Sequence, residues 1–147
     1  MVKEKHYQLL TKQIKAITEG ETNFIANCAN ITALLHEGFP FLWTGFYFVD
    51  DHELILGPFQ GPVACTRIPY GKGVCGSAWQ EEKTLIVGNV HEFPGHIACS
   101  SASNSEIVVP IFKNSKVVAV LDIDSTELDY FDKTDQKYLE QIVSECL

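Results

Sequence analysis

Three of the five cysteines stand where a thiol could do chemistry. Cys65, Cys75 and Cys99 fall at a predicted strand end, in a glycine-rich turn and in a loop, positions that usually carry binding and catalytic groups. Cys28 and Cys146 lie on the apolar stripes of predicted helices, where an unpaired cysteine packs as a small hydrophobic residue. The run that ends at Cys99, HEFPGHIAC, also holds two imidazoles, so this thiol is a candidate nucleophile, a candidate metal ligand or a packed side chain.

Two chemistries compete for these thiols. A zinc site needs four ligands. The available set is His91, His96 and Cys99 with Cys65 or Cys75, but the sequence lacks the close pairs that are typical of zinc sites, such as Cys-x2-Cys. Redox catalysis needs a reactive thiolate and a second thiol that resolves the oxidised product. Two loop cysteines with Cα atoms roughly 4.4–6.8 Å apart would suffice, so the redox interpretation fits the sequence better.

The choice of nucleophile stays open from spacing alone. Cys75 is predicted at the N-terminus of a short helix that begins in GVCGSAWQEE. Free backbone amides at such a terminus lower the pKa of a thiol, which favours Cys75. Cys99 has neighbouring histidines instead, and His96 would either orient its sulfur or only cap the loop.

Three acidic residues form a second candidate group. Asp122 and Asp124 are two positions apart on a predicted strand, so their side chains project from one face. Glu106 begins the partner strand of the hairpin. A two-residue turn at Asn114-Ser115 would pair Glu106 with Ile123, on the other face. The three carboxyl groups therefore share a face only if the loop has an odd length or a strand contains a bulge.

Apolar spacing predicts the elements that must position these groups. The first helix covers residues about 5–19 with the stripe Tyr7, Leu10, Ile14 and Ile17. The second, capped by Thr22 or Asn23 and ended by Gly38-Phe39-Pro40, carries Phe24, Ile25, Cys28, Ile31 and Leu35. Strands are predicted in the runs FLWTGFYFVD, ELILGPF, ACTRIPY, TLIVGNV, EIVVPIF and KVVAVLDID. A capping box of Asp132 and Asp135 opens a last helix, whose inward residues are Leu139, Ile142, Val143 and Cys146. The pattern predicts an α+β domain, an antiparallel sheet with N- and C-terminal helices packed on it.

Size and charge exclude several classes of protein. The 147 residues predict one domain, 1–147, with N-terminal helices over 1–37 and a core over 38–147. The net charge of −8, without a cluster of Lys or Arg, argues against nucleic acid or anionic membranes as partners. The N-terminus has no secretory pattern, and the longest apolar run is too short to span a bilayer. We therefore expect a cytoplasmic location, where thiols stay reduced unless they cycle.

The segments that carry the cysteines resemble a known family. ACTRIPYGKGVCGSA, VHEFPGHIACSSASNSEIVVPI and VLDIDS closely resemble the free methionine-(R)-sulfoxide reductases, which are built on a GAF domain, and the resemblance runs from about Leu42 to the C-terminus. It implies a single GAF-like domain. It also implies that Cys99 is the nucleophile that attacks the sulfoxide sulfur, that Cys65 is the resolving thiol, and that Cys75 is auxiliary, for example as an alternative disulfide partner.

The resemblance extends to the binding residues. Glu106, Asp122 and Asp124 stand where the family holds its substrate, and Trp43 and Tyr47 match the aromatic wall around the substrate methyl group. The implied substrate is free L-methionine (R)-sulfoxide, and thioredoxin is the implied reductant. No metal or organic cofactor is implied.

Three further expectations complete this interpretation. Residues His91–Ser103 would form a lid with Gly95 as its hinge, because the loop must open for substrate and for the reductant. The sequence does not give the oligomeric state, but family members and other GAF domains often pair through terminal helices, which makes a homodimer a candidate assembly. The competing hypothesis is a non-catalytic GAF module that binds a small ligand or senses redox state.

Overall fold

Four α-helices, one 3-10 helix and six strands make up the computed structural model, which describes residues 2–97 and 99–147. Position 1 of the predicted domain and position 98 of the predicted lid lie outside the described residues. No helix in the described ranges is long and apolar enough to cross a bilayer. In chain order the elements are α1 (Val2–Thr18), α2 (Phe24–Gly38), β1 (Trp43–Asp50), β2 (Glu53–Gln60), β3 (Arg67–Pro69), α3 (Gly73–Glu81), β4 (Leu85–Val87), η1 (Val90–Glu92), β5 (Ser105–Lys113), β6 (Lys116–Ser125) and α4 (Lys133–Cys146).

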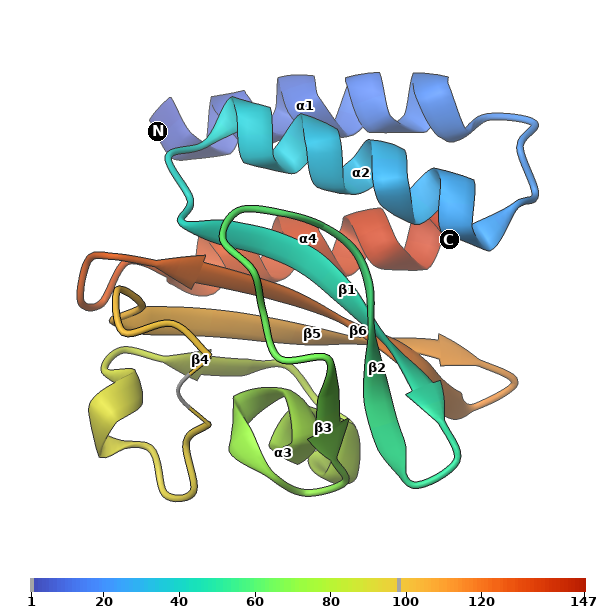
Figure 1. Cartoon of the computed structure of the whole chain (residues 1–147). Coiled ribbons are helices and arrows are strands. Elements are labelled where there is room, and N and C mark those ends of the chain that lie inside the picture. Colours follow the sequence, from blue (N-terminus) through green and yellow to red (C-terminus); the bar gives the residue numbers. More distant parts are fainter. Residues whose placement is uncertain (1, 98) are drawn as a thin grey trace.

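The strands form one antiparallel sheet in the order β3-β2-β1-β6-β5-β4. Helices α1, α2 and α4 lie on one side of this sheet, and α3 with the segments around it lies on the other (Figure 1). The buried apolar side chains divide in the same way into a helical-side cluster and an α3-side cluster. The predicted α+β architecture is confirmed, and the thiols Cys28 and Cys146 belong to the helical-side cluster.

The predicted helix stripes are correct except at two positions. Tyr7, Leu10 and Ile14 are buried, but Ile17 is 51% exposed, because Thr18 lies one full turn after Ile14 and continues the buried face. On α2, Ile25 is 60% exposed, since the buried residues from Asn27 to Leu35 follow a stripe that passes beside it. The C-terminal stripe from Leu139 to Cys146 is buried as predicted.

A buried carboxylate joins the first and last helices. Asp132 and Asp135 form the predicted capping box at the start of α4. Asp135 is fully buried, accepts a 2.6 Å hydrogen bond from the Tyr7 hydroxyl and lies 2.8 Å from Lys3 Nζ. The same side chain therefore caps α4 and holds α1 against it, on the side of the sheet away from α3.

The β5–β6 hairpin contains the irregularity that the acidic residues require. Asn114 and Ser115 have positive φ angles and form a two-residue turn, which pairs Lys113 with Lys116. The register then shifts between Ile111 and Phe112, so that Val118 bulges out of the ladder. Beyond this bulge Glu106 pairs with Asp124. Of the two conditions that the sequence left open, an odd loop length or a bulge, the bulge is the one present, and all three acids line the cavity on the α3 side.

Candidate functional site

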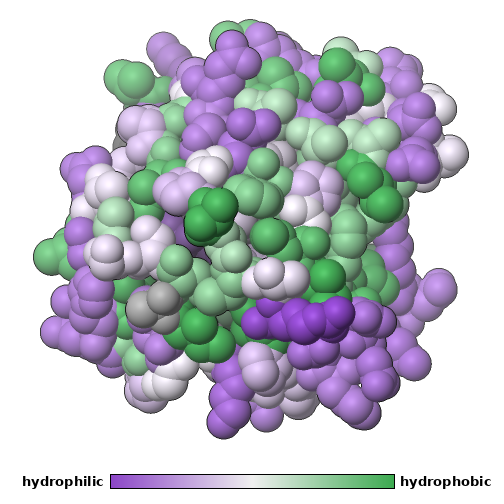
Figure 2. Space-filling view, viewed as in Figure 1, coloured by the Kyte–Doolittle hydropathy of each residue, from purple (hydrophilic) through white to green (hydrophobic). Residues whose placement is uncertain are grey.

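A cavity of about 50 Å³ lies on the α3 side of the sheet and is lined by every predicted site residue except Cys65, which is bonded to the lining residue Cys99. Its floor comes from the ends of β1, β5 and β6, and its walls come from α3, the segment between β2 and β3, and the segment before β5. In the view of Figure 2, which has α1 and α2 at the top and α3 at the bottom, hydrophobic residues gather around the middle and hydrophilic ones lie towards the edges. The lining includes Trp43, Tyr47, Cys75, Cys99, Glu106, Asp122 and Asp124.

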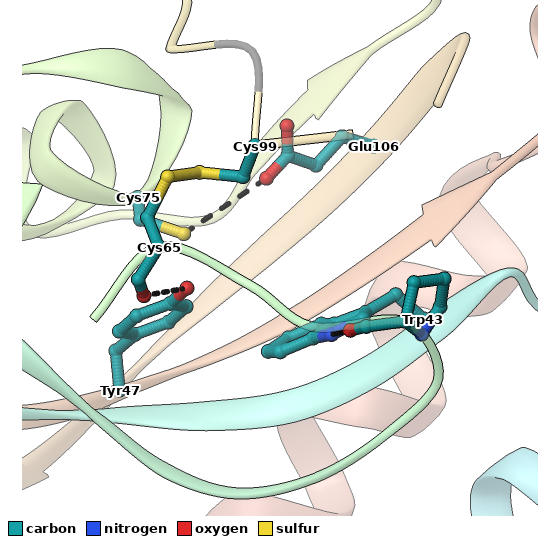
Figure 3. The surroundings of a disulfide bond; sticks show 7 residues. Trp43, Tyr47, Cys65, Cys75, Cys99 and Glu106 are labelled. Carbon is teal, nitrogen blue, oxygen red and sulfur yellow. Dashed lines mark hydrogen bonds between the residues drawn. A yellow bond between two sulfur atoms is a disulfide. The ribbon is translucent and has the colours of Figure 1, made fainter. Parts of the chain in front are cut away.

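A disulfide joins Cys65 to Cys99 in the wall of this cavity (Figure 3). Their Cα atoms are 5.4 Å apart, within the range that a disulfide requires. Cys65 lies between β2 and β3, Cys99 lies between η1 and β5, and both residues are half-buried. The fold thus brings together two thiols that are 34 positions apart in the sequence.

Cys75, the third candidate cysteine, lies in an environment that raises its thiol pKa, whereas the sequence predicted that the pKa is lowered. It does lie in the first turn of α3, but its side chain is buried against the acidic group, with Sγ 3.9 Å from Glu106 Oε2 (Figure 3). Burial, followed by the charges of Asp122 and Glu106, raises the pKa of this thiol well above its usual value. The predicted lowering by the helix N-terminus is therefore wrong, because desolvation and like charge outweigh the amide dipoles.

The three carboxyl groups form one electrostatic unit. Cross-strand pairing puts Asp124 between Trp43 on β1 and Glu106 on β5. Burial and the charge of Asp122 raise the pKa of Glu106 and of Asp124 well above the usual range, and burial also raises the pKa of Asp122. Three carboxyl groups this close titrate together, and burial and mutual repulsion make the protonated form of at least one of them persist to higher pH than in an isolated carboxyl group.

Aromatic side chains of β1 form another part of the lining. The rings of Trp43 and Tyr47 stack with centroids 5.8 Å apart, and Trp43 also stacks on Phe59 at 5.3 Å. The indole Nε1 donates a 3.0 Å hydrogen bond to the Pro62 carbonyl oxygen. A Cβ atom at Gly45 would lie 2.6 Å from the indole ring, so this position must lack a side chain for the stack to form. The indole is consequently rigid before any ligand arrives.

Tyr47 links this wall to the disulfide. Its hydroxyl donates a 2.9 Å hydrogen bond to the carbonyl oxygen of Cys65 (Figure 3). Burial and the neighbouring charge of Asp122 raise the pKa of the phenol, so it stays a neutral donor. The β1 strand therefore positions one end of the disulfide directly.

The histidines do not complete the alternative zinc site. Cys65 and Cys99 are bonded to each other, and the His91 ring uses Nε2 to donate a 2.9 Å hydrogen bond to Asn104 Oδ1. His96 lines the cavity, where burial lowers its pKa. The ligand set that the sequence offered is therefore not assembled in the disulfide-bonded structure.

Sequence reasoning missed several residues of the lining. Ser103 is 5% exposed and lies in the cavity, three positions before Glu106. It belongs to the polar run SSASNSE, which has no apolar period to indicate which side chain turns inward. The other missed lining residues are mostly apolar: Leu42, Pro62, Val63, Ala64, Ile68, Val74, Ile97 and Ser100.

Comparison with known proteins agrees with this geometry. A family model of the GAF domain matches residues 28–146. The chain is 46% identical over 146 residues to free methionine-R-sulfoxide reductase of Escherichia coli, with 99% of this chain and 88% of that protein covered. The chain belongs to the free methionine-R-sulfoxide reductase family.

Two further proteins are similar to this chain over most of their length. The chain is 59% identical over 142 residues to GAF domain-containing protein A of Dictyostelium discoideum, with 96% of this chain and 90% of that protein covered. The X-ray structure of free methionine-R-sulfoxide reductase from Neisseria meningitidis, in complex with its substrate, superposes with a TM-score of 0.93 at 50% identity. The match covers 95% of this chain and 85% of that one. The resemblance that the cysteine segments indicated is confirmed.

Proposed function

We propose that this protein reduces free L-methionine (R)-sulfoxide to L-methionine, with Cys99 as the nucleophile and Cys65 as the resolving thiol. One observation carries the proposal: these two sulfur atoms are bonded in the wall of a cavity that three carboxyl groups line. Membership of the reductase family supports the same reaction, and the related Neisseria protein is described as bound to its substrate.

The substrate groups find complementary partners in the cavity. We assign the methyl group to the rigid wall of Trp43 and Tyr47, since an immobilised aromatic face covers an apolar group at little entropic cost. We assign the ammonium to Asp122 through a charge-assisted hydrogen bond. Glu106 or Asp124, whose raised pKa values favour the protonated form, would hydrogen-bond the sulfoxide oxygen and give it a proton.

The reaction then proceeds in three steps. The Cys99 thiolate attacks the sulfoxide sulfur, the oxygen is transferred as the carboxyl group delivers a proton, and methionine leaves a sulfenic acid on Cys99. The Cys65 thiol condenses with this sulfenic acid, which releases water and forms the disulfide. An external dithiol reduces the disulfide by exchange and becomes oxidised itself.

Thioredoxin is the proposed external dithiol, because the cycle must return two electrons to a disulfide in a reducing compartment. The half-buried Cys65 and Cys99 are reachable by such a partner. We also propose a cytoplasmic location, because thiols in the cytoplasm are kept reduced unless they take part in a catalytic cycle. We also propose a homodimer that pairs through α1, which presents the exposed apolar residues Val2, Leu9 and Ile17.

The test couples turnover to the oxidation of NADPH by thioredoxin reductase and thioredoxin, with free L-methionine (R)-sulfoxide as the substrate. We expect turnover by the wild type and loss of at least a thousandfold in Cys99→Ser. Cys28→Ser is the matched control, since this thiol lies on the other side of the sheet. Binding of the sulfoxide without any turnover would support the GAF ligand-binding module instead.

A second measurement concerns the enclosed pocket. A methionine-sulfoxide residue within a peptide carries amide groups in place of the ammonium and carboxylate, so it loses the partner at Asp122 and meets the cavity wall. We expect the specificity constant for such a peptide to be at least a hundredfold lower than for the free amino acid. Equal specificity constants would contradict this mode of binding.

A further inference from the structure

Three potential metal ligands converge at the base of the cavity. The Sγ atom of Cys75 and one carboxylate oxygen each from Glu106 and Asp122 lie within 4.8 Å of one another. They come from α3, β5 and β6, so the packing of the helix on the sheet fixes their separation. All three residues are more than nine-tenths buried. The proposed reaction does not need Cys75 in this position.

A second observation points to a missing positively charged ligand. The Oδ1 atom of Asp122 is fully buried and finds no hydrogen-bond partner within residues 2–97 and 99–147. Asp122 lines the cavity, so its carboxyl group lies at the boundary of a space that a ligand can enter. A buried carboxylate oxygen without a partner is costly, and such atoms usually mark the place of an ion, a water molecule or a ligand.

We infer that Cys75, Glu106 and Asp122 form a binding site for a thiophilic divalent cation such as Zn²⁺ or Cd²⁺. A tetrahedral zinc ion with ordinary bond lengths separates a sulfur from an oxygen ligand by about 3.6 Å. The observed distance from Cys75 Sγ to Glu106 Oε2 is 3.9 Å, so this pair needs an adjustment of a few tenths of an ångström, and the ligand atoms all lie within 4.8 Å of one another. All three residues line the cavity, so a ligand from that space would complete the coordination of the ion.

The charge and type of these ligands decide which ions bind. One thiolate and two carboxylates place three negative charges around the ion, which displaces the protons that the buried groups otherwise hold. A sulfur ligand selects zinc or cadmium over magnesium or calcium, which prefer six or more oxygen ligands. An ion here occupies the place assigned to the substrate ammonium; on the proposed function, it is therefore a competitive inhibitor rather than a cofactor.

The test titrates Cd²⁺ into the protein with the Cys65–Cys99 disulfide intact, and follows the ultraviolet charge-transfer absorption from thiolate to metal. In this form only Cys28, Cys75 and Cys146 can supply a thiolate. We expect a band that saturates at one ion per chain, and that Zn²⁺ but not Mg²⁺ displaces. No turnover takes place, so the outcome is independent of the reductase activity.

Matched variants identify the ligands. Cys75→Ser should abolish the band, whereas Cys28→Ser, on the other side of the sheet, should retain it. Asp122→Asn should weaken Cd²⁺ binding at least tenfold while the band at saturation stays, which keeps the test decisive even where Cys75→Ser does not fold. The absence of a band in the wild type, or an unchanged band in Cys75→Ser, would overturn the inference.

Discussion

Glu106 on β5 lies directly opposite Asp124 on β6, at the end of the sheet that carries the cavity. The pair exists because one residue, Val118, bulges out near the other end of the hairpin and shifts the register by one. Without this bulge Glu106 would face Ile123 and turn away from the cavity. The acidity of the site thus depends on an irregularity several residue pairs away from it.

The first prediction concerns this carboxyl pair and stability. Because its pKa is raised, the Glu106 carboxyl group keeps its proton to a higher pH in the folded chain than in the unfolded chain. The free energy of unfolding should therefore fall as pH rises from about 4.3, the ordinary glutamate pKa, to the raised value. Glu106→Gln should flatten this dependence and stabilise the protein by about 1 kcal/mol above that window. Urea unfolding at a series of pH values measures this free energy for both proteins.

The matched control is Glu127→Gln, since the side chain of Glu127 is exposed. It should leave the pH dependence as in the wild type. A Glu106→Gln protein that is less stable than the wild type at pH 8 would contradict the argument that this buried acid opposes folding.

The second prediction separates the roles of the sulfur atoms. Cys65→Ser should release about one methionine per chain and then stop, because the sulfenic acid on Cys99 has no neighbouring thiol to condense with. Dimedone should label that sulfenic acid, as detected by mass spectrometry. Cys146→Ser, buried in α4, should turn over normally. Sustained turnover in Cys65→Ser would assign the resolving role to Cys75.

The third prediction concerns the indole wall. Trp43→Phe reduces the apolar area in contact with the substrate methyl group and removes the hydrogen bond to Pro62. We expect a loss of about 1 kcal/mol, which is roughly a fivefold rise in KM with a smaller change in kcat. The comparison is Trp79→Phe, a tryptophan of α3 that packs against Tyr70 and does not line the cavity. If both variants raise KM alike, the wall assignment fails.

The fourth prediction concerns the helical side of the sheet. Asp135→Asn removes the charge that holds Lys3 and alters the acceptor for Tyr7. Breaking a buried pair in this way costs about 3 kcal/mol, and chemical denaturation should detect a loss of this size. The same change at the exposed residue Asp50 should stay within about 0.5 kcal/mol of the wild type. Because the site lies across the sheet, KM should not change in either variant.

The helices, the sheet and its acids were predictable because they follow from local patterns. Apolar spacing identified both N-terminal helices and α4, and the positions of Asp122 and Asp124 placed them on one face. The resemblance of three short segments indicated which thiols come together. The disulfide between Cys65 and Cys99 agrees with that expectation, although it joins segments 34 positions apart.

The predictions from sequence failed where tertiary packing determines the surroundings of a side chain. The sequence places Cys75 in the first turn of a helix, but cannot tell that the helix presses this thiol onto the acids of the sheet, which reverses its pKa shift. Ser103 faces inward because β5 begins two residues later and fixes the chain there. The exposed Ile17 shows the same limit, since the buried face of α1 passes from Ile14 to the polar residue Thr18, whereas apolar spacing favours Ile17.

The bond between Cys65 and Cys99 also cross-links a long stretch of chain, from the start of β3 to the start of β5. In the chain-entropy description, a closed loop of 34 residues disfavours the unfolded ensemble by about 4 kcal/mol. The oxidised protein, which carries the disulfide, is then more stable to unfolding than the reduced protein, which is the form able to start a new reaction. Resistance to heat or to proteases therefore reports the fraction of protein molecules that are oxidised and await reduction.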